Sequence, residues 1–440
     1  MLATILNSFK VADIRKKLMF TAALLALYRL GSFIPVPGVS TEALKQLEDS
    51  YAGSDILGFL NLFTGGGLSR IALFALGIMP YITASIIMQI LTVVIPKLEE
   101  WQQQGAVGQR KITQWTRYLA VAIATLQATA LTFLFHNGGG GLLGGPSNPT
   151  QIDVLPDFTW YRIMLVVLVL ASGMALLMWL GELITQRGIG NGMSLLIFSS
   201  VVSSIPAQFA KIKAEEGYDL LIPLIGLFIL VLIAIVFVEN GQRRIPVQFA
   251  KRVVGRRMYG GQSTYIPLKV NQSGVIPIIF ASSVLSLPLL VTQALPSDPG
   301  SWGVSVQNWV NDNLAQQDSI FYIMFYGLFI IGFAYFYTAI AFDPHKQADT
   351  LRKQGGFIPG IRPGPQTEKY LGKILSRITL PGALFIAAIA LLPSLLLAVA
   401  NVQAFAFGGT SILIAVGVAL ETMKQIDSQL MMRNYEGFLQ

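Results

Sequence analysis

The feature of this sequence that most constrains its fold is a series of long apolar segments. A helix needs roughly 20 apolar residues to cross the hydrocarbon core of a bilayer. Segments of this kind lie at residues 18–36, 71–95, 115–136, 161–184, 193–209, 220–239, 274–294, 319–341, 376–399 and 409–426. Because backbone groups in lipid must be hydrogen-bonded within the protein, these segments should be helical. The sequence therefore predicts an all-α polytopic membrane protein with ten transmembrane helices.

Composition supports this fold class and narrows the chemistry. Of the 440 residues 53% are hydrophobic and 12% are charged, and the mean hydropathy is +0.60. Soluble domains carry about 25% charged residues, so an ordinary water-soluble enzyme is excluded. The chain has no cysteine, and its two histidines, His136 and His345, are far apart. Disulfides and thiolate metal sites are therefore excluded, a histidine metal site is improbable, and no cofactor is expected.

Positive charge predicts the orientation of the spans. If the N-terminus is cytoplasmic, 25 of the 31 Lys and Arg residues fall in segments on the inner side. Basic connections remain in the cytoplasm, so both termini are expected there, which requires an even number of crossings.

The chain divides at residues 210–219, a polar hinge connection between two sets of five spans. Residues 1–17 precede them as an amphipathic interfacial helix, 18–209 form the N-terminal half, and 220–440 form the C-terminal half with cytosolic loops 240–273 and 342–375. Because five is odd, the halves have opposite topology. This is the arrangement of inverted repeats, in which a pathway is expected between the halves.

Residues 56–70 are too short and too rich in glycine to cross the bilayer. The run Thr64-Gly65-Gly66-Gly67 would leave backbone groups unpaired in lipid, and such backbone is tolerated only inside a protein cavity. Two interpretations remain open from these residues: an outer loop that dips slightly, or a short re-entrant helix that plugs a cavity.

The spans themselves carry little reactive chemistry. Glu182, Glu239 and Glu421 all lie at predicted inner ends, so no carboxylate is expected at membrane depth, which argues against an ion-coupled transporter. No His-Glu-x-x-His motif is present, and the chain is not expected to be an enzyme. Ile82 and Ile86 lie one helical turn apart, a spacing more typical of core packing than of a pore.

Both long inner loops are suited to docking. The first carries seven basic residues, Arg243, Arg244, Lys251, Arg252, Arg256, Arg257 and Lys269. This is more than orientation requires and predicts contact with phosphate, including ribosomal RNA, beside contact with anionic lipid. In the second loop, Arg362 stands among glycines and prolines that fix a turn. A guanidinium projected in this way fits a partner that carries carboxylates.

Seven sequence blocks together resemble one family. They are YRLGSFIPVPG (28–38), TGGGLSRIALFALGIMPYITASII (64–87), GELITQRGIGNGMSLLIF (181–198), ENGQRRIPVQFAKR (239–252), GVIPIIFASS (274–283), GGFIPGIRPG (355–364) and FGGTSILI (407–414). The chain resembles the SecY family, channel subunits of the Sec protein translocon, over essentially its full length. It looks most similar to cyanobacterial or plastid members.

The resemblance implies two inverted five-helix halves around an hourglass pore. Residues 56–70 would form the re-entrant plug, with Leu60, Phe63, Thr64, Gly65, Gly66 and Gly67 as its site residues. The ring at the waist would be Ile82, Ile86, Met193, Ile197, Ile279 and Ile414. Met193 departs from the isoleucine that is typical of the family, and a flexible thioether would make that sector softer.

A lateral gate into lipid is implied between the second and seventh spans. Its residues would be Ile87, Gln127, Ser282 and Ser283. Ordinary hydrogen bonding between helices is an equally good explanation of the polar members.

The resemblance also implies partners and a mode of action. The two inner loops would dock the ribosome and the motor ATPase SecA, with Arg243 and Arg244 serving the ribosome and Arg362 the motor. Arg256 and Arg257 would be further partner-binding residues. SecE-type and SecG-type subunits would accompany the chain in the cytoplasmic or the thylakoid membrane, with unfolded polypeptide as substrate and lipid around it. No phosphate-binding Gly-x-x-x-x-Gly-Lys-Ser/Thr run is present, so energy would come from the partners. The alternative hypothesis is an inverted-repeat transporter for a neutral solute.

Overall fold

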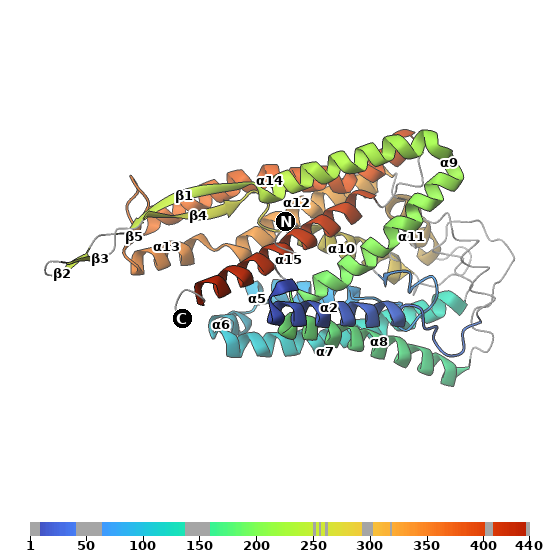
Figure 1. Ribbon diagram of the computed structural model, residues 1–440. Coiled ribbons are helices and arrows are strands. Elements are labelled where there is room, and N and C mark those ends of the chain that lie inside the picture. The colour runs from blue at the N-terminus through green and yellow to red at the C-terminus, as the bar shows by residue number, and fades with distance from the viewer. Residues whose placement is uncertain are drawn as a thin grey trace.

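The computed structural model describes residues 9–40, 64–136, 159–249, 252–254, 257–259, 263–292, 302–316, 319–400 and 408–436. These residues are mainly helical, and the helices form two groups that lie against each other (Figure 1). A slender extension of β-strands projects from one end.

The N-terminal group contains α2 (Ala12–Gly31), α5 (Met79–Val94), α6 (Pro96–Gln103), α7 (Ala106–His136), α8 (Trp160–Arg187) and the first arm of α9 (Gly192–Asn240). Pro96 removes a backbone donor, and the chain turns by 100° between α5 and α6. The helix α6 has no buried residue, so it lies on the surface at one end of the group.

The C-terminal group begins with the second arm of α9. It continues with α10 (Ile276–Thr292), α11 (Trp302–Val310), the π-helix η1 (Asn311–Ala315), α12 (Ile320–Ala341), α13 (Pro344–Lys353), α14 (Pro365–Ala400) and α15 (Gly408–Glu436). The end of α15 lies at the same end of the molecule as α6 and α13 (Figure 1).

The two groups are joined by the bend of α9, where Gly217 adopts φ 73° and ψ −163° inside the helix. Glycine takes a positive φ without steric cost, so the chain can reverse here without a loop. Gly217 falls within the predicted hinge connection at 210–219. In Figure 1 the arms diverge from this bend into the two groups.

Each predicted span coincides with a described helix or with one arm of α9, although several boundaries differ. The second helix begins at Met79, not at 71, because residues 65–78 form consecutive turns. The first helix, α2, runs through residues 17 and 18 without a break.

Five helices are long and apolar enough to cross a membrane by themselves within the described residues: Trp160–Arg187, Gly192–Ala214, Gly217–Asn240, Ile320–Lys353 and Pro365–Leu396. The bent pair α5 and α6 would provide a sixth.

The first inner loop is folded as β-structure, which the sequence analysis did not predict. Strand β1 (Gln242–Phe249) pairs antiparallel with β4 (Ser263–Lys269), Ile245 opposite Ile266, and β5 (Gly356–Phe357) adds to the other edge of β1. A second small hairpin pairs β2 (Arg252–Val254) with β3 (Arg257–Tyr259). Ile245 and Val247 are buried, while the residues between and before them are exposed. This alternation is the period of a strand with one covered face.

Candidate pore collar, plug and lateral seam

The largest hydrophobic cluster lies between the two groups of helices. It contains residues of α2, α5, α8 and the first arm of α9 together with residues of α10, α12, α14 and α15. No Asp, Glu, Lys or Arg is among the fully buried side chains of the described residues. The interface between the halves is therefore closed by apolar side chains.

All six residues of the predicted ring lie in this cluster. Ile82 and Ile86 come from α5, Ile197 from α9, Ile279 from α10 and Ile414 from α15, and each is at most 8% exposed; Met193 of α9 is partly buried and packs against them. Four helices from both halves thus contribute to one apolar site, which we call the collar (Ile82, Ile86, Met193, Ile197, Ile279 and Ile414). The helical spacing of Ile82 and Ile86 places both on the buried face of α5.

Two glycines set the position of Met193. A Cβ at Gly181 of α8 would lie 2.5 Å from the Met193 Sδ, and a Cβ at Gly192 would lie 1.8 Å from the Gly181 carbonyl oxygen. The helices α8 and α9 approach so closely here that no side chain fits. Asn191 caps α9 by accepting a hydrogen bond from the Met193 backbone N–H at 3.1 Å. The block GELITQRGIGNGM therefore fixes one side of the collar.

The predicted plug is described only from Thr64 onward, and Leu60 and Phe63 lie outside the described residues. Residues 65–70 form turns, with Gly65 at φ 64° and Gly66 at φ 83°. Thr64 is buried, and its Oγ1 accepts a hydrogen bond from the Leu68 N–H at 3.2 Å. We call residues 64–67 the plug base.

Three side chains that the sequence analysis did not select lie beside the plug base at Gly65. Arg29 Nη1 donates a hydrogen bond to the Gly65 carbonyl oxygen at 2.8 Å. The Tyr28 hydroxyl shares a hydrogen bond with the Ser200 hydroxyl of α9. Tyr28 and Arg29 lie in the block YRLGSFIPVPG, but their meeting with Gly65 and Ser200 depends on the tertiary arrangement, which no spacing in the sequence reveals.

The boundary between α5 and α10 is the predicted lateral seam. Ser282 and Ser283 are buried, and both hydroxyls donate to the Ile279 carbonyl oxygen of their own helix, at 2.9 and 2.7 Å. Ser283 Oγ also lies 3.9 Å from the Met79 Sδ of α5. Ile87 is half-buried on α5, and Gln127 is buried on α7, which packs against α5 and α8.

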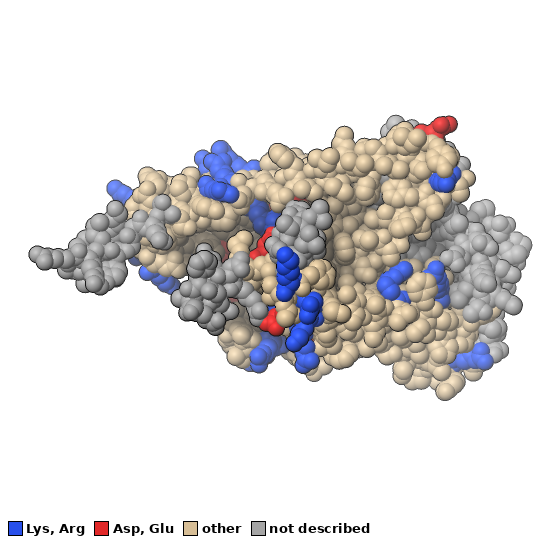
Figure 2. Space-filling view, in the orientation of Figure 1, with Lys and Arg blue, Asp and Glu red and all other residues tan. Residues whose placement is uncertain are grey.

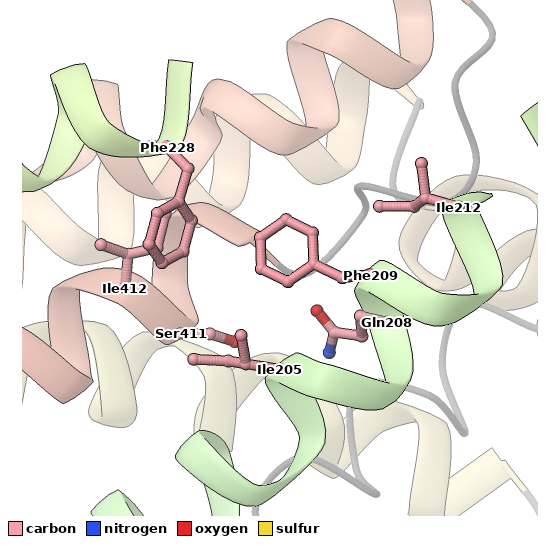
Figure 3. Close-up of a pocket in the computed structure, with 7 residues that line it drawn as sticks. All are labelled: Ile205, Gln208, Phe209, Ile212, Phe228, Ser411 and Ile412. Carbon is pink, nitrogen blue, oxygen red and sulfur yellow. The ribbon is translucent and has the colours of Figure 1, made fainter. Parts of the chain in front are cut away.

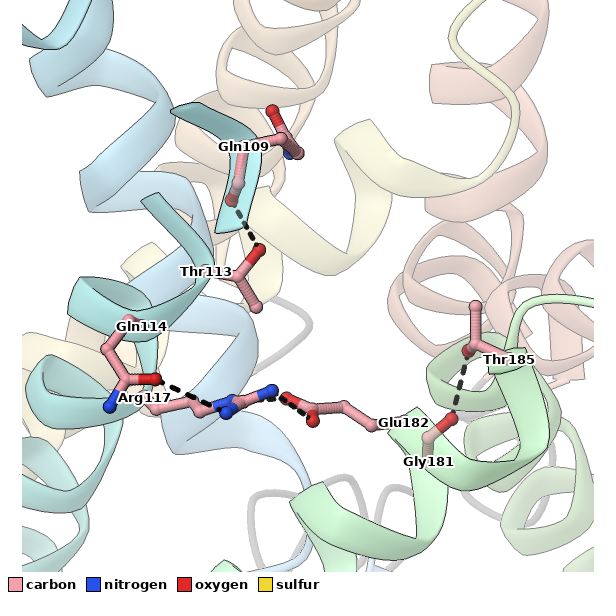
Figure 4. A network of polar contacts seen from close by, with 7 residues as sticks. All are labelled: Gln109, Thr113, Gln114, Arg117, Gly181, Glu182 and Thr185. Atoms are coloured by element: carbon pink, nitrogen blue, oxygen red, sulfur yellow. Dashed lines mark hydrogen bonds and ion pairs between the residues drawn. The ribbon is translucent and has the colours of Figure 1, made fainter. Parts of the chain in front are cut away.

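A charged pair joins α7 to α8 within the N-terminal group (Figure 4). Arg117 donates from Nε and Nη2 to the two carboxylate oxygens of Glu182, at 2.7 and 2.6 Å. This bidentate geometry is the strongest arrangement for such a pair. Arg117 also donates to Gln114 Oε1 at 3.4 Å. The pair lies outside the collar and braces the helices behind α5.

A small cavity lies at the bend of α9 (Figure 3). It is lined by Ile205, Gln208, Phe209, Ile212, Phe228, Ser411 and Ile412. Its walls come from both arms of α9 and from α15, and it has room for about one water molecule. The buried Ser411 hydroxyl has no hydrogen-bond partner among the described residues.

Lys and Arg side chains gather toward the end of the molecule that carries α6, α13 and the β1–β4 hairpin (Figure 2). Arg243 and Arg244 are exposed on β1, and the Arg244 guanidinium stacks 4.8 Å above the Tyr265 ring of β4. Arg257 lies in β3, whereas Arg256 lies outside the described residues.

Arg362 is exposed at a turn between β5 and α14. Gly360 and Gly364 flank it at φ 81° and 111°, and Ile358 anchors the turn in a hydrophobic cluster beneath the hairpin.

Comparisons with known proteins agree with this geometry. A family model described as SecY matches residues 72–423. The chain is 50% identical over 446 residues to the protein translocase subunit SecY of Mycobacterium bovis, and 50% identical over 449 residues to that of Streptomyces scabiei; each match covers 100% of both chains.

Solved structures share the fold. One described as a protein-conducting channel is matched with a TM-score of 0.62 at 19% identity, covering 93% of this chain and 91% of that chain. A structure on the plug domain of the SecY protein gives a TM-score of 0.60 at 22% identity with the same coverage. A canine Sec61 in a ribosome-channel complex gives 0.58 at 19% identity, again with the same coverage.

Proposed function

This chain belongs to the SecY family, and on that premise we propose that it is the pore-forming subunit of a Sec translocon, a gated channel that moves unfolded polypeptides across the membrane. The observation that carries the proposal is the collar: apolar side chains from α5, α9, α10 and α15 meet in one buried cluster between the two halves. The pathway expected between inverted repeats passes through this place.

The collar explains how such a pore is sealed at rest. A narrow apolar constriction expels water and offers a hydrated ion no ligands to replace its hydration shell, so the ion's desolvation cost prevents leakage. The seal contains no specific bond that must break, because apolar contacts are non-directional. The side chains can part around an extended chain and close again behind it.

Residues 56–70 serve in this proposal as the plug on one side of the collar. A structure of a relative is described by its plug domain, which stabilises the closed state of that channel and maintains a membrane seal. In this chain Arg29 of α2 donates a part-buried hydrogen bond to the Gly65 carbonyl oxygen of the plug base, which supports the same role.

The seam between α5 and α10 serves as the lateral gate. The Ser282 and Ser283 hydroxyls both donate to the Ile279 carbonyl oxygen of α10, and the contact of Ser283 across the seam is to the Met79 Sδ, a weak acceptor. An apolar segment in the pore can leave between these helices into lipid, where burial of its side chains is favourable. Ile87 and Gln127 would flank this exit.

The basic end of the molecule faces the cytoplasm in this proposal, together with both termini, in the cytoplasmic or the thylakoid membrane. Arg243, Arg244, Arg256 and Arg257 would contact ribosomal RNA; a relative of the same fold was solved in a ribosome-channel complex. Arg362 would contact the SecA motor, and SecE-type and SecG-type subunits would complete the assembly. The chain itself catalyses no reaction and relies on these partners for energy.

The experiment is a conductance measurement on the purified complex in planar bilayers. Ile86→Gly and Ile279→Gly remove collar side chains and should raise the resting ion conductance several-fold. Ile90→Gly is the matched control, because Ile90 lies one turn beyond Ile86 on α5 and is 37% exposed. Unchanged conductance in both collar variants, or an equal rise in the control, would contradict the assignment of the collar.

A further inference from the structure

The plug base is attached to α2 by one charged side chain. Arg29 lies two residues before the end of α2 and donates to the Gly65 carbonyl oxygen at 2.8 Å. Hydrogen bonds from a charged donor are about twice as strong as neutral ones. The carbonyl belongs to a turn residue, so this bond replaces a backbone partner that a helix would have supplied.

A second contact fixes the position of the arginine. Tyr28, the neighbour of Arg29, is 2% exposed and is hydrogen-bonded to Ser200 of α9, whose own hydroxyl also bonds to the Leu196 carbonyl oxygen at 3.0 Å. The Tyr28 ring packs 5.8 Å from the Phe74 ring, in the turns that follow the plug base. The end of α2 is thereby held against α9 and against the segment that leads into α5.

Gly65 is required for this arrangement. Its φ of 64° favours glycine, and a Cβ built there would lie 2.8 Å from Arg29 Nη1, 3.1 Å from the Tyr28 hydroxyl and 3.5 Å from the Ser200 hydroxyl. The side chains of Tyr28, Arg29 and Ser200 therefore converge on the space that a Cβ at Gly65 would occupy.

The chain after the plug base is also held by backbone hydrogen bonds to the segment that follows α2. The Val36 N–H donates to the Ile71 carbonyl oxygen at 3.0 Å, and the Leu73 N–H donates to the Ile34 carbonyl oxygen at 2.9 Å. Ile71 has a φ of 43°, a strained conformation for a β-branched residue, at the point where the plug base meets this pairing. A displacement of the plug that pivots here would also break the hydrogen bond from the Ala72 N–H to the Gly67 carbonyl oxygen, at 2.8 Å.

We propose that Arg29 is a positioning residue that latches the plug in the closed state through the Gly65 carbonyl, with Tyr28 and Ser200 holding the latch in place. The inference rests on the proposed function, since it requires residues 56–70 to be the plug. When the plug leaves, the guanidinium keeps an alternative contact, because it lies 5.3 Å from the centre of the Phe33 ring.

Arg70 provides a matched control. Its guanidinium lies 4.5 Å from the centre of the same Phe33 ring. Arg29, by contrast, donates a side-chain hydrogen bond to the Gly65 carbonyl oxygen of the plug base. Substituting either arginine removes one positive charge from the same region. A difference in resting conductance between the two variants therefore cannot come from net charge.

The test compares the resting conductance of Arg29→Gln, Arg29→Lys and Arg70→Gln in planar bilayers, using the complete complex. Loss of one charge-assisted hydrogen bond should raise the population of the displaced plug about tenfold. We expect Arg29→Gln to raise conductance by that factor and Arg29→Lys to restore most of the seal. Arg70→Gln, which also lies in the predicted plug segment 56–70, should raise conductance much less than Arg29→Gln. Wild-type conductance in Arg29→Gln, or an equal rise in Arg70→Gln, would overturn the latch.

A second readout follows the plug itself. The chain has no cysteine, so Ser69→Cys provides a single thiol beside the plug base. Labelling by a membrane-impermeant maleimide should be faster in Ser69→Cys with Arg29→Gln than in Ser69→Cys alone; equal rates would count against the latch.

If Arg29→Gln fails to assemble, Gly65→Ala keeps the guanidinium but displaces it, and should show the same rise in conductance. A normal seal in Gly65→Ala would then overturn the proposal. Ile86→Gly distinguishes failure of the latch from failure of the proposed channel. If Ile86→Gly raises the resting conductance and Arg29→Gln does not, the latch is contradicted and the proposed channel function is not. If Ile86→Gly is also silent, the proposed collar fails.

Discussion

Ser283 Oγ of α10 and Met79 Sδ of α5 lie 3.9 Å apart, although the residues are 204 positions apart in sequence. A thioether is a weak acceptor, and the Ser283 hydroxyl already bonds to the Ile279 carbonyl oxygen at 2.7 Å. The contact of Ser283 with Met79 across this seam is thus a weak one. A weak contact here fits the proposed lateral gate.

The seam can be locked with a cysteine pair, since the chain has no cysteine of its own. We expect oxidised Met79→Cys with Ser283→Cys to block the insertion of a signal-anchor segment into lipid, and a reductant to restore it. The measurement is the fraction of the segment that resists carbonate extraction from proteoliposomes. Each single variant is a control. Normal insertion through the oxidised double variant would show that the exit lies elsewhere.

The packing of α8 against α9 predicts unequal effects of two alanine substitutions. At Gly192 an added Cβ would lie 1.8 Å from a backbone oxygen, which cannot move without separating the helices. At Gly181 the nearest atom is the Met193 Sδ at 2.5 Å, on a flexible side chain. Overpacking costs about 1–3 kcal/mol.

We expect the destabilisation by Gly192→Ala to lie in the upper part of this range or beyond it, and the destabilisation by Gly181→Ala to lie in the lower part. The fall in Tm of the detergent-solubilised complex should therefore be larger for Gly192→Ala. Gly226, which has open space around its Cβ position, is the control. Gly181→Ala should also raise resting conductance, because it displaces a collar residue. Equal losses of Tm would contradict this account of the contact.

The ion pair between Arg117 and Glu182 should stabilise the N-terminal half. Its side chains are 37% and 17% exposed, so solvent weakens the pair only partly. We expect Arg117→Gln to lower the free energy of unfolding by about 1–3 kcal/mol because the Glu182 carboxylate loses both donors. Arg110→Gln on the exposed face of the same helix should have little effect.

A double-mutant cycle with Glu182→Gln tests the pairing itself. A coupling energy near zero in thermal or denaturant unfolding would show that the pair contributes nothing.

The sequence predicted the helices because length and apolarity determine them one segment at a time. The resemblance also implied six collar residues. Five of them are buried in one cluster and Met193 packs against it, while their role as a pore ring stays a prediction. The β1–β4 hairpin was not predicted, although Ile245 and Val247 alternate with exposed residues as in a strand with one covered face. The loop was interpreted from its seven basic residues and not from this alternation.

The contacts of Arg29 and Ser200 were beyond prediction for another reason. Hydrogen bonds between residues 36 or 172 positions apart depend on how helices pack, and no local pattern records that.

Arg362 provides a test of docking that leaves the channel intact. The turn around it is fixed from within: Gly360 and Gly364 have positive φ, and the Thr367 hydroxyl donates to the Arg362 carbonyl oxygen at 3.0 Å. The guanidinium itself is exposed, so charge reversal should change stability by no more than about 0.5 kcal/mol.

We expect Arg362→Glu to reduce SecA-driven export into vesicles at least tenfold, because a carboxylate would repel the acidic partner that the guanidinium attracts. Insertion from ribosome-bound chains, which would use Arg243 and Arg244, should continue. Lys369→Glu makes the same charge change at an exposed position in the first turns of α14 and is the matched control. Normal export in Arg362→Glu would remove Arg362 from the docking site. An equal loss of export in Lys369→Glu would do so too, because the effect would then depend on net charge and not on the projecting turn.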